Sequence, residues 1–116
     1  MADHHAYFDA VGPNFVRALQ PRAFIIPAWY VAHPSILPLR RMLSQQLYKG
    51  DRDVYATSVM LANRIVNNQF ISKLKSLDGH VVVRVAPGGG EFRVIIRDNA
   101  DDSARVKAVF GPYPCS

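Results

Sequence analysis

The fold is decided by two stretches of alternating polarity, Gly79-His80-Val81-Val82-Val83-Arg84-Val85 and Glu91-Phe92-Arg93-Val94-Ile95-Ile96-Arg97. Alternation with a period of two gives each strand one apolar face and one polar face. The run Ala86-Pro87-Gly88-Gly89-Gly90 between them breaks the pattern, since glycine permits a positive φ. The two stretches predict an antiparallel hairpin. Its glycine-rich loop is not a phosphate-binding loop, because no helix follows it.

A third run follows the same rule after the polar loop 98–103. It points Val106, Ala108 and Phe110 inward and Arg105, Lys107 and Val109 outward. The loop lacks the glycine and the final glutamate of a calcium loop, so it is interpreted as a solvated turn. These three runs predict a three-stranded antiparallel sheet.

The outward face of this sheet gathers positive charge around a short apolar strip. In one register Arg84 lies opposite Arg93 and His80 opposite Arg97, and in a tighter one Arg84 lies opposite Glu91. Like charges face to face cost a few tenths of a kcal/mol or more unless an anion separates them. The face is either a solvated surface or a platform for phosphates or an acidic partner. Its cations are Arg84, Arg93, Arg97, Arg105 and Lys107, around Val82, Ile95 and Val109.

Upstream of the sheet the apolar pattern changes to a helical period. One helix is expected from about Pro38 to Lys49, stopped by Gly50. A second is expected from about Asp53 to Leu77, unless Asn67-Asn68 breaks it into two. The apolar stripe of the second helix is expected to face the core, and it comprises Tyr55, Val59, Ala62, Val66, Phe70, Leu74 and Leu77, widened by Leu61 and Ile65.

Residues 1–36 form an irregular arm, because five of the eight prolines fall between Pro13 and Pro38. Short helical turns are expected over 3–11 and 13–19, and the runs 23–26 and 29–31 look extended. One of these runs is expected to add a strand to the sheet. The arm either wraps the core of its own domain or docks on a partner subunit.

These elements predict one α+β domain over residues 1–116, with an arm at 1–36, a helical pair at 37–77 and the sheet at 78–116. Cys115 has no second cysteine to pair with, which favours a reducing, intracellular compartment, the cytoplasm first. The longest apolar run, 23–32, is too short to span a bilayer, so no membrane association is expected.

The sequence gives little support for a metal site or a cofactor site. His4 and His5 are adjacent and would point apart on regular structure, while His33 and His80 are isolated in sequence. No metal and no cofactor are therefore expected. The net charge of +5, with ten of fourteen basic residues being arginine, instead favours phosphates and carboxylates as ligands.

One reaction needs no metal, namely RNA cleavage by the 2′-hydroxyl of the RNA itself. It requires a base for the hydroxyl, positive charge on the phosphorane and an acid for the leaving oxygen. The candidate catalytic residues are Arg84, Arg93, Tyr113 and His80, and the question of catalysis stays open at this point.

The order of a strand, two helices and a three-stranded meander resembles the small toxins of the RelE/ParE/HigB type. The stretch Ser72-Lys73-Leu74-Lys75-Ser76-Leu77-Asp78-Gly79-His80-Val81-Val82-Val83-Arg84-Val85 is similar to their lysine-rich helix end followed by glycine and an arginine-bearing strand. Glu91-Phe92-Arg93-Val94-Ile95-Ile96-Arg97-Asp98 is similar to their next strand. The resemblance implies a sheet that cradles RNA, with Lys73, Lys75, Arg84 and Arg93 on the phosphate. It implies that Tyr113 stands near the terminal aromatic or histidine of the family.

The sequence thus predicts a basic polyanion-binding protein, most concretely an RNA-binding or metal-independent RNA-cleaving, toxin-like domain. One alternative is a non-enzymatic subunit of a larger viral, organellar or ribonucleoprotein assembly, which binds an acidic protein or docks through its arm. Another is a homodimer that pairs sheets or arms. The predicted nucleic-acid-binding residues are Lys73, Lys75, Arg84, Arg93, Arg97, Arg105 and Lys107.

Overall fold

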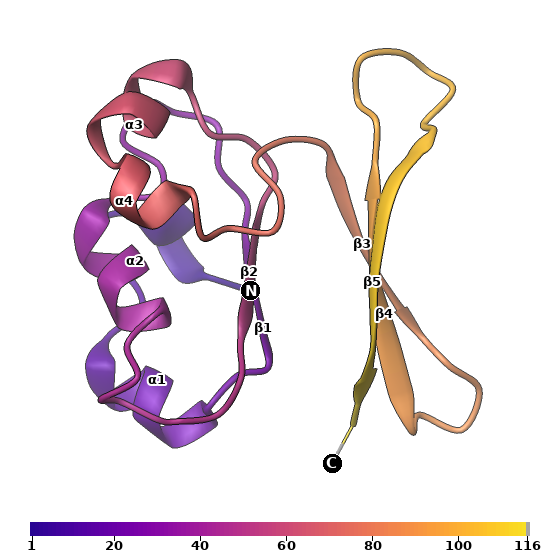
Figure 1. Ribbon diagram of the computed structural model, residues 1–116, viewed down its shortest axis with the longest axis horizontal. Coiled ribbons are helices and arrows are strands. Elements are labelled where there is room, and N and C mark those ends of the chain that lie inside the picture. Colours follow the sequence, from indigo (N-terminus) through magenta and orange to yellow (C-terminus); the bar gives the residue numbers. More distant parts are fainter. Residues whose placement is uncertain (116) are drawn as a thin grey trace. The chain divides into compact units, whose positions relative to one another are not determined.

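The computed structural model describes residues 1–115, and it divides the chain into two compact units, Met1–Leu77 and Asp78–Ser116 (Figure 1). Helices dominate the first unit and an antiparallel sheet makes up the second, so the α+β class is confirmed. The boundary between the units coincides with the predicted end of the helical pair. That the whole chain makes one domain stays a prediction.

The first unit is built on two parallel strands, β1 (Ala23–Ile26) and β2 (Asp53–Ala56), which pair from Ala23↔Asp53 to Ile26↔Ala56. Figure 1 shows its four α-helices on one side of these strands. The helical elements are η1 (Asp3–Ala6), α1 (Pro13–Leu19), α2 (Ile36–Met42), α3 (Leu61–Val66) and α4 (Asn68–Ile71).

The predicted helix over 53–77 is wrong at both ends, because its helical residues are 61–66 and 68–71 and the chain is not helical from 72 to 77. Residues 53–56 form β2, because the backbone N–H of Asp53 donates to Arg22 and that of Thr57 to Ile26, so β1 supplies their partners. A short apolar run fits a strand as well as a helix until its partner is known. The alternative of a break at Asn67-Asn68 is confirmed, since α3 ends at Val66 and α4 begins at Asn68.

The predicted helix over 38–49 is too long. Helix α2 begins at Ile36 and ends at Met42, and the chain then turns. The guanidinium of Arg52 donates to carbonyl oxygens of this turn, with Nη1 2.7 Å from the oxygen of Ser44 and Nη2 2.8 Å from that of Gly50. The first of these charge-assisted hydrogen bonds satisfies a carbonyl that a longer helix would have used itself.

The proline-rich arm packs into the core of its own unit. Its expected strand is β1, but β1 pairs with β2 and adds no strand to the antiparallel sheet, which corrects that expectation. The N–H of Ala2 donates to the oxygen of Ile25 at 2.7 Å, and Ala6 and Val16 are fully buried.

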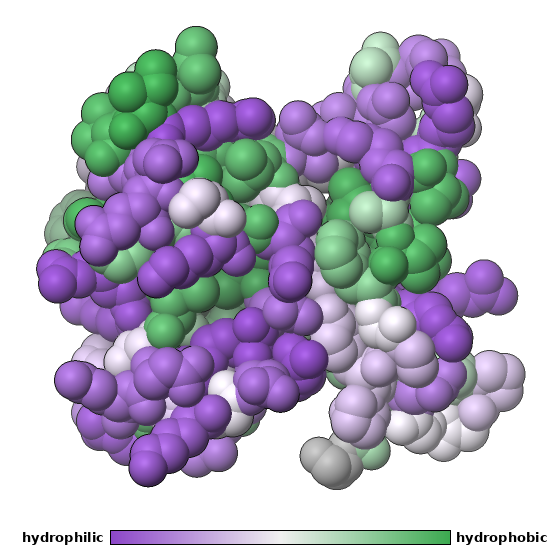
Figure 2. Space-filling model, in the orientation of Figure 1, coloured by the Kyte–Doolittle hydropathy of each residue, from purple (hydrophilic) through white to green (hydrophobic). Residues whose placement is uncertain are grey.

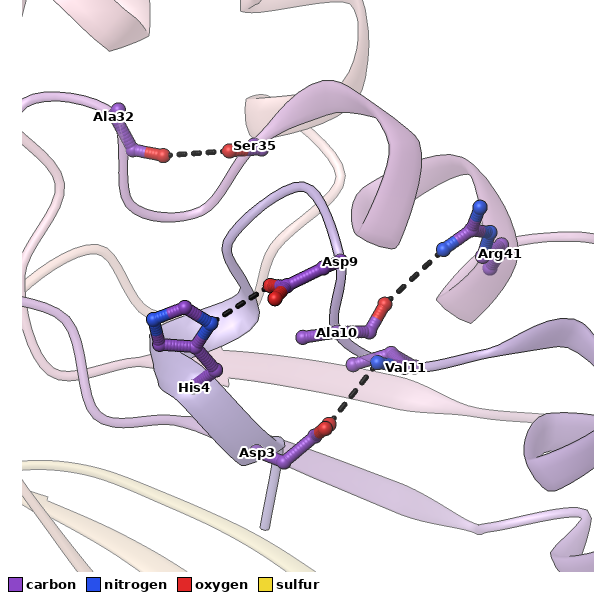
Figure 3. A network of polar contacts seen from close by, with 8 residues as sticks. All are labelled: Asp3, His4, Asp9, Ala10, Val11, Ala32, Ser35 and Arg41. Atoms are coloured by element: carbon purple, nitrogen blue, oxygen red, sulfur yellow. Dashed lines mark hydrogen bonds and ion pairs between the residues drawn. The ribbon is translucent and has the colours of Figure 1, made fainter.

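Polar contacts close around the first turns of the arm (Figure 3). The carboxylate of Asp3 accepts from the N–H of Val11 at 3.0 Å, and Arg41 on α2 donates to the oxygen of Ala10 at 3.1 Å. These hydrogen bonds tie the arm to the rest of the first unit.

The second unit is a meander of β3 (His80–Val85), β4 (Glu91–Arg97) and β5 (Val106–Pro114), in the order β3-β4-β5. The first of the two predicted registers is the observed one, with Arg84 opposite Arg93 and His80 opposite Arg97. Register shifts interrupt the β4–β5 pair between Phe92 and Val94 and between Ile96 and Arg97.

Candidate anion-binding face of the antiparallel sheet

The side chains that lie directly opposite one another in an antiparallel pair share a face of the sheet. The pairs His80↔Arg97, Val82↔Ile95 and Arg84↔Arg93 therefore lie on one face, and Ile95↔Val109 extends this face onto β5. Arg97↔Val106 continues the face beyond the second register shift, and Lys107 stands at that shift beside Val106. We call this surface the arginine face, and its members are His80, Val82, Arg84, Arg93, Ile95, Arg97, Val106, Lys107 and Val109.

An apolar strip crosses the middle of the arginine face. Val82, Ile95 and Val109 are neighbours on successive strands, and Val82 and Val109 are 38% and 56% exposed. Arg84 and Arg93 lie on one side of this strip along the strands, while His80, Arg97 and Lys107 lie on the other. The face has no Phe, Tyr or Trp, so bases have no aromatic ring on which to stack.

The pair Arg84 and Arg93 is the least compensated part of the face. Arg93 Nη1 lies 3.3 Å from Glu91 Oε1, an ion pair between half-exposed groups. Arg84 is exposed and forms no hydrogen bond or ion pair through its side chain with any of residues 1–115. The first register shift of β5 falls opposite Arg93, so no β5 residue is its direct partner. Arg84 and Arg93 are thus direct cross-strand neighbours, and the one carboxylate paired with either of them, that of Glu91, belongs to Arg93.

The cations on the other side of the strip have partners within the unit. Arg97 donates through Nε to the oxygen of Ala104 at 2.6 Å. Lys107 forms an ion pair with Asp78. Arg105 lies just before β5; its backbone oxygen accepts from the N–H of Asp98 at 2.7 Å, and its exposed side chain forms no hydrogen bond or ion pair with any of residues 1–115. Arg97 and Lys107 can support an anion held at Arg84 and Arg93, but they are less available to bind one alone.

Tyr113 lies on the opposite face from the arginines. It is 4% exposed, it pairs with Phe92 across the strands, and the two ring centroids are 5.0 Å apart. The register shift after Phe110 turns this residue inward, although simple alternation from Val109 would turn it outward. The second shift has the reverse effect on Val106, which was expected inward but pairs with Arg97 and is 54% exposed.

Lys73 and Lys75 belong to the first unit. The ammonium of Lys73 lies 5.9 Å from the centroid of the Phe70 ring. The backbone N–H of Lys75 donates to the oxygen of Val54 on β2 at 2.8 Å. The sheet itself therefore brings together five predicted site residues that carry or can carry positive charge, namely His80, Arg84, Arg93, Arg97 and Lys107.

The charge of the chain is divided unequally between the units. Residues 78–116 contain five basic and five acidic residues, so their formal charge is zero, whereas residues 1–77 contain nine basic and four acidic ones. Three of the acidic residues of the sheet unit, Asp98, Asp101 and Asp102, lie in the loop between β4 and β5. The arginine face is therefore a local concentration of cations on a unit without net charge, which the total of +5 did not indicate.

The described part of the chain was also searched for metal sites and for membrane-spanning helices. Among residues 1–115, no three His, Cys, Asp or Glu side chains gather where they would hold a metal ion. Within the same residues, every helix is too short or too polar to span a bilayer. The loop 86–90 joins β3 to β4, and its Gly88 and Gly89 have positive φ, as expected for a hairpin.

Comparisons with protein-family models, with curated proteins and with solved structures found no match to this chain.

Proposed function

We propose that the arginine face binds the phosphate backbone of RNA, with Arg84 and Arg93 on one phosphate group. One observation carries the proposal: two arginines are direct cross-strand neighbours, and Arg84 has no carboxylate of its own among residues 1–115. Such a pair costs stability in the absence of a ligand and becomes favourable once an anion lies between the guanidinium groups.

The chemistry of the face favours a phosphate over a base. A guanidinium group offers two parallel N–H donors that match two phosphate oxygens. Direct neighbours on an antiparallel pair have Cβ atoms about 5 Å apart, so both side chains can reach one phosphate. Without Phe, Tyr or Trp on the face, bases are not stacked, and recognition independent of RNA sequence follows.

The proposal is binding without cleavage. His80 shares the face with Arg84, but it lies four residues away along β3, about 13 Å, so it is out of hydrogen-bond reach of a 2′-hydroxyl beside a phosphate held at Arg84 and Arg93. The second proton-transfer group expected from the sequence, Tyr113, is buried on the other face. The toxin-like activity implied by the family resemblance would need another acid, and cleavage is therefore an outcome to be tested separately.

The test is fluorescence anisotropy with a short single-stranded RNA over a series of salt concentrations. Arg84→Gln is expected to weaken binding about tenfold or more, as for a lost charge-assisted hydrogen bond. It should also reduce the log-log salt slope by about 0.7 if one phosphate contact is lost. Arg17→Gln is the matched control, because Arg17 is an exposed arginine on α1 in the other unit.

Equal losses in Arg84→Gln and Arg17→Gln would overturn the proposal, since binding would then follow total charge alone. The same reactions, resolved on a gel, report cleavage. A 2′,3′-cyclic phosphate product that disappears in His80→Ala would extend the function to catalysis. Intact RNA throughout would leave binding as the whole function.

A second candidate is an acidic protein segment as the ligand, which would make the chain a non-enzymatic subunit of an assembly. The apolar strip of Val82, Ile95 and Val109, whose two valines are exposed, favours it, because an apolar centre flanked by arginines is typical of protein interfaces. Val109→Asp separates the two candidates. It should abolish the binding of an acidic amphipathic peptide. RNA binding should weaken only as far as one added negative charge on the face requires.

A further inference from the structure

Helix α3 has its polarity reversed relative to an ordinary surface helix. Leu61, Ile65 and Val66 are 71%, 68% and 79% exposed, whereas Asn63 is 4% exposed. A surface helix normally turns its apolar side to the core and its polar side to water. Figure 2 shows apolar atoms gathered over the end of the unit where Figure 1 labels α3.

Hydrogen bonds fix this orientation of the helix. The side-chain amide of Asn63 donates from Nδ2 to the oxygen of Pro34 at 2.9 Å, and its Oδ1 accepts from Nδ2 of Asn67 at 2.7 Å. Turning α3 about its axis would leave these buried groups without partners, at a cost for each of about 1–3 kcal/mol. The apolar side of α3 is therefore held outward by the fold.

An apolar groove runs beside this exposed ridge. It has a volume of about 400 Å³ and lies between α3 and the segment 31–36. Val31, Pro34 and Ile36 line one wall, and Ala62 and Val66 line the other. Ridge and groove thus adjoin on one surface, which we call the α3 surface and define as residues 31–36 and 60–67.

We propose that the α3 surface is the interface of a symmetric homodimer. A two-fold axis brings the same patch of both copies together, so a ridge beside a groove is self-complementary: each ridge enters the groove of the other copy. The large apolar side chains of the surface are 37–79% exposed and together expose on the order of 600 Å², the size of the largest patches found on monomers. A standard interface buries about 800 Å² on each partner. Trp29 and Tyr30, 66% and 50% exposed and directly before Val31, supply much of the remainder.

The charges of the surface favour a second copy over other partners. Its one Lys, Arg, Asp or Glu residue is Arg64, whose Nε donates to the oxygen of Val59 at 2.7 Å. Two identical surfaces therefore bring only one charged side chain from each copy into the interface, and its Nε already has a partner in its own chain. An acidic protein or an anionic lipid surface would instead gain from free cations, which this surface does not supply from its own residues.

The oligomeric state of the full chain tests the proposal by sedimentation velocity over a concentration series. The wild type is expected to be a dimer at high concentration. Val66→Lys is expected to raise the dissociation constant at least tenfold, because two charges would be buried in the interface. Leu19→Lys is the matched control and should leave the dimer intact. Leu19 ends α1 as Val66 ends α3, it is 60% exposed, and lysine suits the last turn of either helix.

A cross-linking experiment tests the geometry. In a Cys115→Ser background, chains with Ile65→Cys are mixed with chains with Ile36→Cys, so that each chain carries one cysteine. A ridge that enters the partner's groove predicts a disulfide-linked heterodimer in excess of either homodimer.

Three results would overturn the proposal: a wild type that stays monomeric at the highest concentration, equal dimerisation of Val66→Lys and Leu19→Lys, or no excess of the mixed cross-link. Pelleting of a monomeric wild type with anionic vesicles, lost in Val66→Lys, would assign the surface to lipid instead.

Discussion

Gly79 lies directly against the backbone of Arg97 at the start of the β3–β4 pair. A Cβ atom on Gly79 would be 2.7 Å from the carbonyl oxygen of Arg97 and 3.0 Å from Cγ2 of Ile96. The residue also has a φ of +105°, which side chains other than hydrogen rarely permit. This glycine therefore allows the chain to enter β3 in the register that pairs His80 with Arg97.

Gly79→Ala should lower the free energy of unfolding by about 2–4 kcal/mol, because strain at positive φ and a backbone clash add together. Gly88→Ala is the control. Gly88 has a φ of +87°, but a Cβ there would meet no atom within 4 Å. It should cost only about 1 kcal/mol. Urea unfolding of both variants provides the measurement, and equal losses would show that the contact with Arg97 does not matter.

The pairing of Arg84 with Arg93 predicts that stability and binding change in opposite directions. Arg84→Thr removes the like-charge contact and introduces a residue with high strand propensity, so the unfolding free energy should stay the same or rise by a few tenths of a kcal/mol. RNA binding should weaken at the same time. Arg93→Thr should gain less stability, because it also removes the ion pair with Glu91. Parallel losses of stability and binding in Arg84→Thr would contradict this account.

The sheet could be predicted from the sequence because its strands alternate in polarity with a period of two and a glycine-rich loop separates the first two strands. The apolar faces of the strands also match in the predicted pairing. The positions that differed, Val106 and Tyr113, follow register shifts in β5. A shift adds a residue to one strand and reverses the parity of everything beyond it. Alternation alone does not mark such shifts. It placed His80, Arg84, Arg93 and Arg97 on one face, but it gave Val106 the wrong face and did not indicate that Tyr113 lies opposite the arginines.

The first unit was harder to predict because its pairing is distant in sequence. Residues 53–56 continue the helical stripe of residues 59–77, and only β1, some thirty residues upstream, makes them a strand. The reversed polarity of α3 was also hidden. Leu61 and Ile65 widen the expected core stripe, and Asn63 gives no sign in the sequence that its amide will face inward to Pro34. Periodicity finds an apolar side, but not the direction in which tertiary packing turns it.

Arg52 organises the turn after α2, and its removal should destabilise the first unit. Its guanidinium carbon lies 3.5 Å from the centroid of the Tyr48 ring, and its nitrogens donate to the oxygens of Met42, Ser44, Tyr48 and Gly50. Arg52→Lys keeps the charge but loses the planar fork, so a loss of about 1–3 kcal/mol is expected, with a larger loss for Arg52→Ala.

Chemical denaturation measures these losses, with Arg17→Ala as the control. Arg17 is exposed and its side chain donates to Asn14 at 3.3 Å, so its removal should change the unfolding free energy by no more than about 0.5 kcal/mol. If Arg52→Lys were as stable as the wild type, the positive charge alone, and not the fork over Tyr48, would hold the turn.

His33 makes the stability of the first unit depend on pH. Its ring is 7% exposed, its Nδ1 is buried and finds no hydrogen-bond partner among residues 1–115, and the ring of His5 stacks on it with centroids 5.0 Å apart. Burial lowers the pKa of His33, and the nearby charges of His5 and His4 lower it further. Tyr7, Trp29 and Tyr30 complete its surroundings with their rings.

The direction of this pH dependence follows from proton uptake by His33 in the folded and the unfolded chain. The unfolded chain takes up a proton on His33 near pH 6.5, whereas the folded chain resists it until a lower pH. The unfolded state therefore binds more protons as the pH falls from about 7 to 5, and the free energy of unfolding should decrease over this range. His33→Phe keeps a ring in the cluster and cannot be protonated, so its profile should be flatter than that of the wild type. His80→Gln, which changes an exposed strand residue, should retain the wild-type slope. Urea unfolding at several pH values compares the three proteins, and identical slopes for His33→Phe and the wild type would show that another group carries the dependence.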